Sequence, residues 1–292
     1  MMLKQNVLKF SAFALIASFL GVSSCKEEEE RLTIQDTADI TEEAVTEGYF
    51  QDLDDMAGIA IESPSDTEYS SGRTSGSISI EDHRLNCDGI VVTIESDASS
   101  TVEAPRGVLT IDFGTSGCTD LKGNVRKGKL IFTYNGKRFM PQSTVVTTTE
   151  NYYMNDVKLE GTRTLTNVQN STSDAPRFNV VLANGRATFS DEKFATRESN
   201  ITWRWVREEN PINDNLRIEN TSTASGTTRS GREYSMMLLE DLVYKRHCGI
   251  AVQGVKRYTI NGTKEITINF GDGTCDRAFT VTTNGVTREI SL

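Results

Sequence analysis

The pattern of hydrophobic and polar residues changes character along the chain. Residues 10–22 form a mainly apolar run, residues 37–61 carry apolar residues at steps of three and four, and the chain after residue 77 alternates with a period of two. Steps of three and four define one face of a helix, whereas a period of two places alternate side chains on opposite faces of a strand. The pattern therefore predicts one N-terminal amphipathic helix followed by β-sheet.

The predicted helix runs from Thr37 to about Ile61. Thr37 can cap its start, and Glu42, Glu43 and Glu47 lie in the early turns, where the helix dipole favours acidic residues. Asp54 and Asp55 are expected on a solvated face. The predicted apolar stripe consists of Ile40, Ala44, Phe50, Leu53, Ala57 and Ile61. Such a helix could cover one face of the β domain or bind a partner.

Four segments after residue 77 show clear alternation, with polar residues at the intervening positions. They are Ile78 and Ile80; Leu130, Phe132 and Tyr134; Phe178, Val180 and Leu182; and Ile201, Trp203 and Trp205. Residues 236–244 are also expected to form buried strand rather than helix. The fold class that follows is all-β: an antiparallel sandwich or a large curled sheet with one N-terminal amphipathic helix.

Asn-Gly pairs are strong signals for tight hairpin turns, because both residues tolerate a positive φ. Four such pairs occur in the chain, and those at 135–136, 184–185 and 284–285 each lie close to a predicted strand. We therefore expect a hairpin turn at each of these three positions.

An internal repeat organises the cysteines. Residues 110–114 (TIDFG) precede Cys118 as residues 267–271 (TINFG) precede Cys275, and Cys87 and Cys248 lie upstream at corresponding places. Four cysteines allow three disulfide pairings, and the repeat selects Cys87–Cys118 with Cys248–Cys275. A zinc site that uses His83 and His247 is disfavoured because the two histidines do not occupy equivalent positions.

The repeat also suggests the organisation of the chain. The expected segments are a signal peptide (1–24), an acidic tether (25–36), a helix and linker (37–76), a first β repeat (77–166), connecting β hairpins (167–227) and a second β repeat (228–292).

The pieces TIDFGTSGCTD (110–120), NYYMNDVKLEGTRTLTN (151–167) and INFGDGTCD (268–276) resemble a group of uncharacterised Bacteroidetes-type surface lipoproteins. The resemblance covers most of residues 70–292. It implies a cellular location and an architecture, but no activity.

The N-terminus has the layout of a bacterial lipoprotein signal. Lys4 and Lys9 precede the apolar run, which is too short to span a bilayer comfortably, and two serines lead directly to Cys25. We expect cleavage before Cys25 and lipidation of that residue. The following charge cluster, Lys26, Glu27, Glu28, Glu29 and Glu30, resembles an export signal to the cell surface, so a surface-facing outer-membrane location is favoured over a periplasmic one. Asp36-Thr37-Ala38 also resembles an O-glycosylation sequon at Thr37.

Charge and motifs restrict the function. Removing residues 1–24 lowers Lys+Arg from 31 to 29 and leaves Asp+Glu at 41, a net charge near −12 that disfavours nucleic acid as a partner. No catalytic motif, metal-ligand motif or cofactor signature is recognisable. The glycine-rich turns could in principle bind calcium, but their aspartates lack the usual spacing of calcium ligands; these are Asp112, Asp120, Asp272 and Asp276.

The expected function is a non-enzymatic, lipid-anchored surface protein that binds a glycan or protein ligand or has a structural role. The alternatives are a carbohydrate-active hydrolase with an unrecognised carboxylate pair and a fimbria-like assembly subunit. Trp203 and Trp205, which share their parity with Ile201, are expected in the core rather than on a ligand platform.

Overall fold

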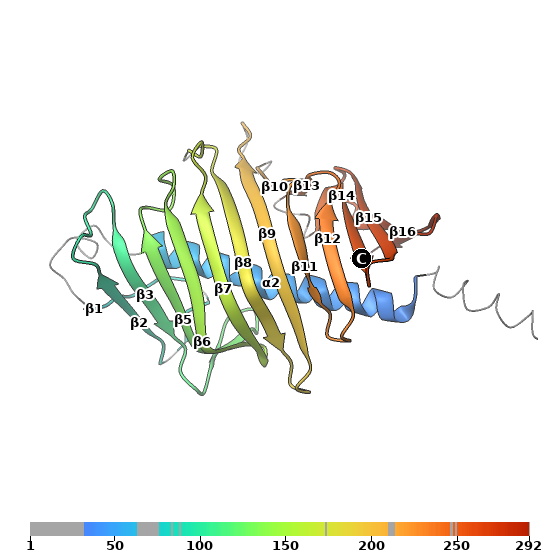
Figure 1. Ribbon diagram of the computed structural model, residues 1–292. Helices are drawn as coiled ribbons and strands as arrows, with labels where there is room; N and C mark the ends of the chain where they lie inside the picture. Colours follow the sequence, from blue (N-terminus) through green and yellow to red (C-terminus); the bar gives the residue numbers. More distant parts are fainter. Residues whose placement is uncertain are drawn as a thin grey trace, which may run out of the picture.

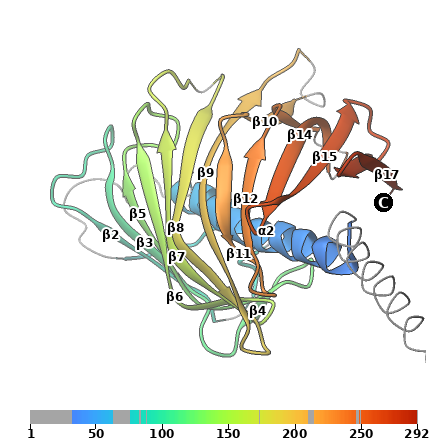
Figure 2. The same ribbon diagram turned by 45° about the vertical axis from the view of Figure 1, so that its right-hand side comes forward.

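The structure is a computed structural model that describes residues 32–62, 76–82, 84–87, 89–172, 174–209, 214–245, 248 and 250–291. In these ranges it contains the helix α2 (Ile34–Glu62) and one seventeen-stranded sheet in which every pairing is antiparallel. The sheet curls around the helix, which crosses the strands on the concave side (Figures 1 and 2). The predicted all-β class with one N-terminal helix is confirmed, and the form is a curled sheet rather than a sandwich.

The strands are mostly long in the middle of the sheet and shorter toward its edges. They are β1 (Gly76–Ser77), β2 (Val91–Ser96), β3 (Arg106–Asp112), β4 (Cys118–Thr119), β5 (Val125–Asn135), β6 (Thr144–Met154), β7 (Val157–Asn167), β8 (Arg177–Thr188), β9 (Phe194–Val206), β10 (Asn215–Ile218), β11 (Thr223–Thr227), β12 (Glu233–Leu238), β13 (Leu242–Lys245), β14 (Ala251–Ile260), β15 (Lys264–Asp272), β16 (Ala278–Thr283) and β17 (Val286–Ser291). Residues 236–244, expected to form one buried strand, contribute to both β12 and β13.

Most neighbouring strands are consecutive in sequence, so the sheet is largely a meander. At β9 the order divides: β10 pairs with one half of β9 and β11 with the other half. β13 and β12 continue these two halves, and both then pair with β14. Two short strands therefore take the place of one long strand at two successive positions: β10 and β11 next to β9, and β13 and β12 next to β14. Through these short strands the sheet continues without a break from β9 to β14.

A line of β-bulges bends the central strands around the helix. Gly128 has a φ of 81° and lies so close to Asn151 that a Cβ would stand 2.0 Å from its carbonyl oxygen. Gly161 has a φ of 132° and faces Gly185, with 2.9 Å between its Cβ position and the Gly185 Cα. Register shifts accompany both contacts. Bulges increase local twist and bend a strand, so these glycines help to curl the sheet.

The three Asn-Gly pairs for which the sequence predicts a turn have three different structures, and the fourth pair, Asn261-Gly262, lies in the connection between β14 and β15. Asn284 and Gly285, with φ of 48° and 77°, form the expected two-residue turn between β16 and β17. At 135–136 the predicted hairpin is present, because β5 pairs with β6, but the tight turn is wrong: Asn135 ends β5 and an eight-residue connection (136–143) leads to β6. The predicted turn is also wrong at 184–185, because these residues lie inside β8 and form its bulge. A positive φ serves a bulge as well as a turn.

The helix begins three residues before the predicted start. The Thr33 hydroxyl accepts a hydrogen bond from the Asp36 amide at 3.1 Å, and the Asp36 carboxylate accepts one from the Thr33 amide at 2.7 Å. This reciprocal pair is a capping box, so Thr33 rather than Thr37 caps the helix. Thr37 lies on an exposed face one turn later, and residues 34–36 of the expected tether are helical.

Two hydrophobic clusters lie under the helix. Its C-terminal half, with Phe50, Leu53 and Met56, belongs to a cluster formed with strands β2 to β8. Leu32 and Ile40, at its N-terminal end, pack against a second cluster formed by β9 to β16. One helix therefore contacts both halves of the sheet.

The two expected disulfides are present. Cys87 pairs with Cys118 and Cys248 with Cys275, with Cα–Cα distances of 5.7 and 5.5 Å. Each repeat segment also ends in the same local turn: Asp112 accepts a hydrogen bond from the Gly114 amide, as Asn269 does from the Gly271 amide. The pairing is confirmed, and the duplication of the whole unit stays a prediction.

Candidate functional site

The face of α2 that meets the sheet is acidic in its first half and apolar in its second. Eight buried positions follow one another at alternating steps of three and four residues: Asp36, Asp39, Glu43, Thr46, Phe50, Leu53, Ala57 and Ala60. This spacing forms one continuous stripe along the helix. The predicted stripe is wrong at Ala44, which is exposed, whereas Ile40 packs against the second cluster as expected.

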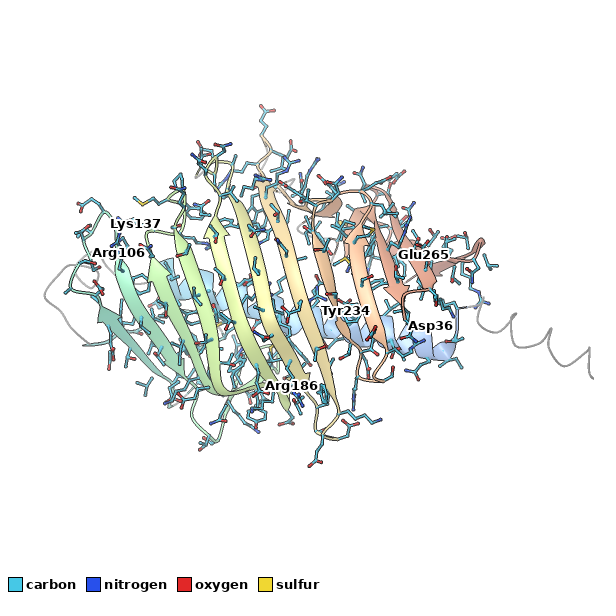
Figure 3. All side chains as sticks on the ribbon, viewed as in Figure 1. Asp36, Arg106, Lys137, Arg186, Tyr234 and Glu265 are labelled. Atoms are coloured by element: carbon cyan, nitrogen blue, oxygen red, sulfur yellow. A yellow bond between two sulfur atoms is a disulfide. The ribbon has the colours of Figure 1, made fainter. Side chains whose placement is uncertain are left out.

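Basic residues of the sheet neutralise the acids at the helix N-terminus. Asp36 accepts hydrogen bonds from Lys264 at 2.5 Å and from Arg232 at 2.7 Å, and Arg232 also binds Asp39. Burial alone would raise the pKa of Asp36, but the hydrogen bonds from Lys264, Thr33 and Arg232 lower it to about 2. Figure 3 shows Asp36 at the end of the helix that lies over the C-terminal strands.

Glu43 and Glu47 contact the middle of the sheet. Arg197 and the Tyr258 hydroxyl both donate to the Glu43 carboxylate. Arg197 also lies 3.3 Å from Glu47, which binds Lys256 at 3.3 Å as well. Burial lowers the pKa of Lys256 and the Glu47 carboxylate raises it, and the net direction is upward. The Glu47 carboxylate therefore keeps Lys256 charged in a buried environment.

The C-terminal half of the helix carries a third set of ion pairs. Arg126, whose side chain is 1% exposed, donates to both oxygens of Asp52 at 2.9 Å and to Asp120 at 2.7 Å. Arg163 donates to both oxygens of Asp54. The expectation that Asp54 lies on a solvated face is therefore wrong, because the carboxylate is buried against Arg163; the neighbouring Asp55 side chain is 66% exposed.

A pocket of about 110 Å³ opens between this part of α2 and the strands β7, β9 and β10. Its apolar wall consists of Leu165, Ile201, Trp203, Trp205, Leu216 and Ile218. Its polar lining consists of Glu47, Gln51, Asp54 and Asp55 from the helix, Arg138 from the β5–β6 connection, and Arg163, Arg197 and Ser199 from the sheet. The pocket thus combines aromatic surface with alternating hydrogen-bond donors and acceptors.

Both tryptophans of the chain line this pocket. Trp203 packs on the core through Phe178, with 4.6 Å between ring centroids. Trp205 is the penultimate residue of β9, and both side chains are half-buried. The shared parity predicted for the two tryptophans agrees with their common pocket, but they contribute to its wall as well as to packing.

The Ser199 hydroxyl is the unusual polar group of the pocket. The residue is 7% exposed, and its hydroxyl has no hydrogen-bond partner among the residues that the structure describes. A buried hydroxyl without a partner costs free energy unless something binds to it. Ser199 is therefore a position where a ligand group could satisfy an unmet hydrogen bond.

The other residues predicted from the sequence are either outside the described residues or contribute to contacts elsewhere. Cys25 and the cluster Lys26–Glu30 are outside the described residues, as are His83 and His247. Asp120 binds Arg126 and the amides of Lys122 and Asn124, and these contacts lower the pKa that burial would raise. Within the described ranges, no group of three or more His, Cys, Asp or Glu residues is placed to hold a metal ion.

The sequence did contain a signal for the ion pairs that was missed. Arg163 shares its parity in β7 with buried Leu159 and Leu165, and Arg197 shares its parity in β9 with buried Ala195 and Ile201. A basic residue at an inward position needs a buried acid. The acids at the same helical phase as Phe50 and Leu53 could have supplied the partner.

Comparisons with family models, with curated proteins and with solved structures find no match to this chain. In the described part of the chain, no helix has the length and apolar character needed to cross a membrane.

Proposed function

We propose that this protein is a non-enzymatic, lipid-anchored component of the outer membrane, facing the cell surface, whose β body binds a ligand in the pocket beside α2. The observation that carries the binding role is the combination of two half-buried tryptophans and the unpartnered Ser199 hydroxyl in one pocket. Aromatic walls with a few placed polar groups are typical of ligand sites. The signal-peptide pattern before Cys25 and the acidic cluster after it support the proposed location at the cell surface.

The anchor can be tested separately from the pocket. Globomycin, which blocks lipoprotein signal cleavage, should leave a precursor, and Cys25→Ala should release or mislocalise the protein. Replacing Glu27 to Glu30 with alanine should protect the protein from protease added to whole cells. A membrane-anchored Cys25→Ala protein, or equal digestion of the wild type and the alanine variant, would contradict the corresponding part of the proposal.

The binding role can be tested by intrinsic fluorescence, since both fluorescent indoles report on the pocket. Purified protein should change its tryptophan emission when it is mixed with fractions of envelope glycans, peptides or lipids. A response that survives in Ser199→Ala and Trp205→Phe alike, and that also appears with free tryptophan, would speak against a ligand in the pocket.

One observation favours hydrolysis as a second candidate. Asp55 lines the pocket with 66% of its side chain exposed, and partial desolvation of its carboxyl, together with the neighbouring carboxylates of Asp52 and Asp54, raises its pKa against the opposing effect of Arg84. A carboxyl with a raised pKa can serve as a general acid. Turnover of a bound glycan that Asp55→Asn abolishes without loss of binding would establish this alternative.

A further inference from the structure

We infer that the pocket beside α2 binds one ring of a neutral saccharide, with Trp205 as the stacking surface and Ser199 as a hydrogen-bonding partner. This inference rests on the proposed function and adds the chemical class of the ligand. Three properties of the pocket lead to it: its size, its charge balance and the arrangement of its polar and aromatic groups.

The size admits part of a single ring. The pocket volume is about 110 Å³, below that of a cavity of about 150 Å³ that holds benzene and far below the roughly 300–1,000 Å³ of sites for drug-sized ligands. The lining extends from the exposed Asp55 on the helix to Trp205 near the end of β9. One side of a terminal sugar ring can therefore enter, while the rest of that ring and of a longer molecule stays outside.

The charges of the pocket favour a neutral ligand. Arg163 is bound by both oxygens of Asp54, and Arg197 is bound by Glu43 and Glu47. An anionic ligand would have to compete with these buried carboxylates for the guanidinium groups. A cationic ligand would compete with the guanidinium groups for the carboxylates. Breaking a buried pair leaves an uncompensated charge, which is strongly unfavourable.

Hydroxyl groups match the polar lining. Each hydroxyl can donate to a carboxylate such as Glu47 or Asp54 and accept from a guanidinium such as Arg163 or Arg197. Ser199 lies two residues beyond Arg197 on the same strand and offers a further hydroxyl that lacks a partner in the described part of the chain. A ring that carries several hydroxyls can use all of these groups without displacing an ion pair.

The tryptophans provide the complementary apolar surface. One face of Trp203 is occupied by Phe178, so we assign the stacking role to Trp205 at the end of β9. The C–H face of a sugar ring can pack on an indole while its hydroxyls point to the polar lining. A purely apolar ligand would leave the buried Ser199 hydroxyl unsatisfied.

The test uses the full mature chain and defined probes. A printed array of neutral and acidic glycans selects the best neutral oligosaccharide, which is then titrated by calorimetry beside an acidic oligosaccharide of equal length and a fatty acid. Trp205→Ala should weaken binding of the neutral probe by about tenfold or more. Ser199→Ala should weaken it by about three- to tenfold while the thermal unfolding midpoint stays at or above that of the wild type.

Phe194→Ala is the matched control. Phe194 is an aromatic residue of the same strand, but it is 41% exposed and has the opposite parity to Trp203 and Trp205. Its removal should leave the affinity for the neutral probe unchanged. Binding that is insensitive to both Trp205→Ala and Ser199→Ala, or that is equally sensitive to Phe194→Ala, would overturn the assigned site.

The outcomes also separate this inference from the proposed function. Pocket-dependent binding of the acidic probe or the fatty acid, without binding of neutral glycans, would refute the saccharide class and leave the binding role intact. Absence of binding to all three classes, with identical behaviour of the wild type and both pocket variants, would overturn both.

Discussion

The contact between Arg163 and Asp54 shows how single residues hold the helix against the sheet. Both side chains are less than 10% exposed, and the guanidinium donates to both carboxylate oxygens. Taking two charges out of water is costly, and the pair offsets that cost only while both partners are present. The contact therefore favours the one position of the helix on the sheet in which Arg163 and Asp54 meet.

We expect Arg163→Met to lower the free energy of unfolding by about 3–5 kcal/mol, because it leaves the Asp54 charge buried without a partner. The double variant Arg163→Met/Asp54→Leu should recover most of that loss, since an apolar pair can replace a buried ion pair. Urea unfolding measures both. The exposed pair Lys127–Asp156 is the control, and its removal should cost less than about 1 kcal/mol.

Two glycines should respond in opposite directions to alanine. Gly161→Ala should destabilise by about 2–3 kcal/mol, because its φ is 132° and its Cβ would meet the backbone of Gly185. Gly48→Ala should stabilise by about 0.5–1 kcal/mol, because Gly48 is helical and no atom of the described residues outside the helix backbone lies within 4 Å of its Cβ position. Thermal denaturation of both variants checks the sign, and an unchanged Gly161→Ala protein would argue against the bulge.

At the scale of the elements, the N-terminal end of α2 is held to the sheet by charge alone along its buried stripe, whereas the C-terminal end combines apolar packing with the ion pairs of Asp52 and Asp54. Asp36, Asp39 and Glu43 contact basic groups from β9, from the connection between β11 and β12, and from β15. Phe50 and Leu53 are in the apolar cluster. The two ends of one helix should therefore respond differently to pH.

Acid should loosen the N-terminal end first. The pKa of Asp36 is lowered in the folded state from 3.8 to about 2, so its contribution is present above the unfolded pKa and is lost as pH falls from about 5 toward 2. The shift corresponds to about 2 kcal/mol. Urea midpoints measured from pH 7 to pH 2 should fall less steeply for Asp36→Asn than for the wild type. Parallel pH profiles would contradict the assignment.

Each disulfide should stabilise its own loop. The bridges close sequence separations of 31 and 27 residues, which corresponds to about 3–4 kcal/mol each in the chain-entropy account. Replacing either cysteine pair with alanine should produce similar losses in urea unfolding. A loss for one pair of less than about 1 kcal/mol would show that the two loops are not energetically equivalent.

At the scale of the whole molecule, one continuous sheet and one helix connect all described parts. β9 pairs with β8 on one side and with both β10 and β11 on the other, and α2 contacts both hydrophobic clusters. A local loss of structure on either side would expose apolar surface on the other.

We therefore expect the amides of Phe50 to Ile61 to share the slowest class of hydrogen exchange with strands β5 to β8, because both are buried in the same cluster. Exchange monitored by mass spectrometry at neutral pH tests this. Leu53→Ala, expected to cost about 2–5 kcal/mol, should accelerate exchange in helix and sheet together. Fast exchange in the helix alone would mean that it detaches from an otherwise intact sheet.

The sequence by itself determined the kinds of element and the disulfide pairing. Alternation of polar and apolar residues is a local property, so strands such as β5 and β9 could be predicted from their own residues. The repeated T-I-x-F-G-x3-C segment indicated which cysteines pair, because equivalent positions lie in equivalent surroundings.

Tertiary structure alone decided the inward direction of the acids, the role of two Asn-Gly pairs and the position of the pocket. Asp36, Glu43 and Asp54 are buried because basic residues more than 100 positions away meet them across the sheet, and no local pattern carries that information. Asn184 and Gly185 form a bulge because Gly161 of the neighbouring strand approaches them closely. The pocket exists because α2 crosses β7, β9 and β10 at the place where Ser199 and Trp205 lie, which depends on the curvature of the whole sheet.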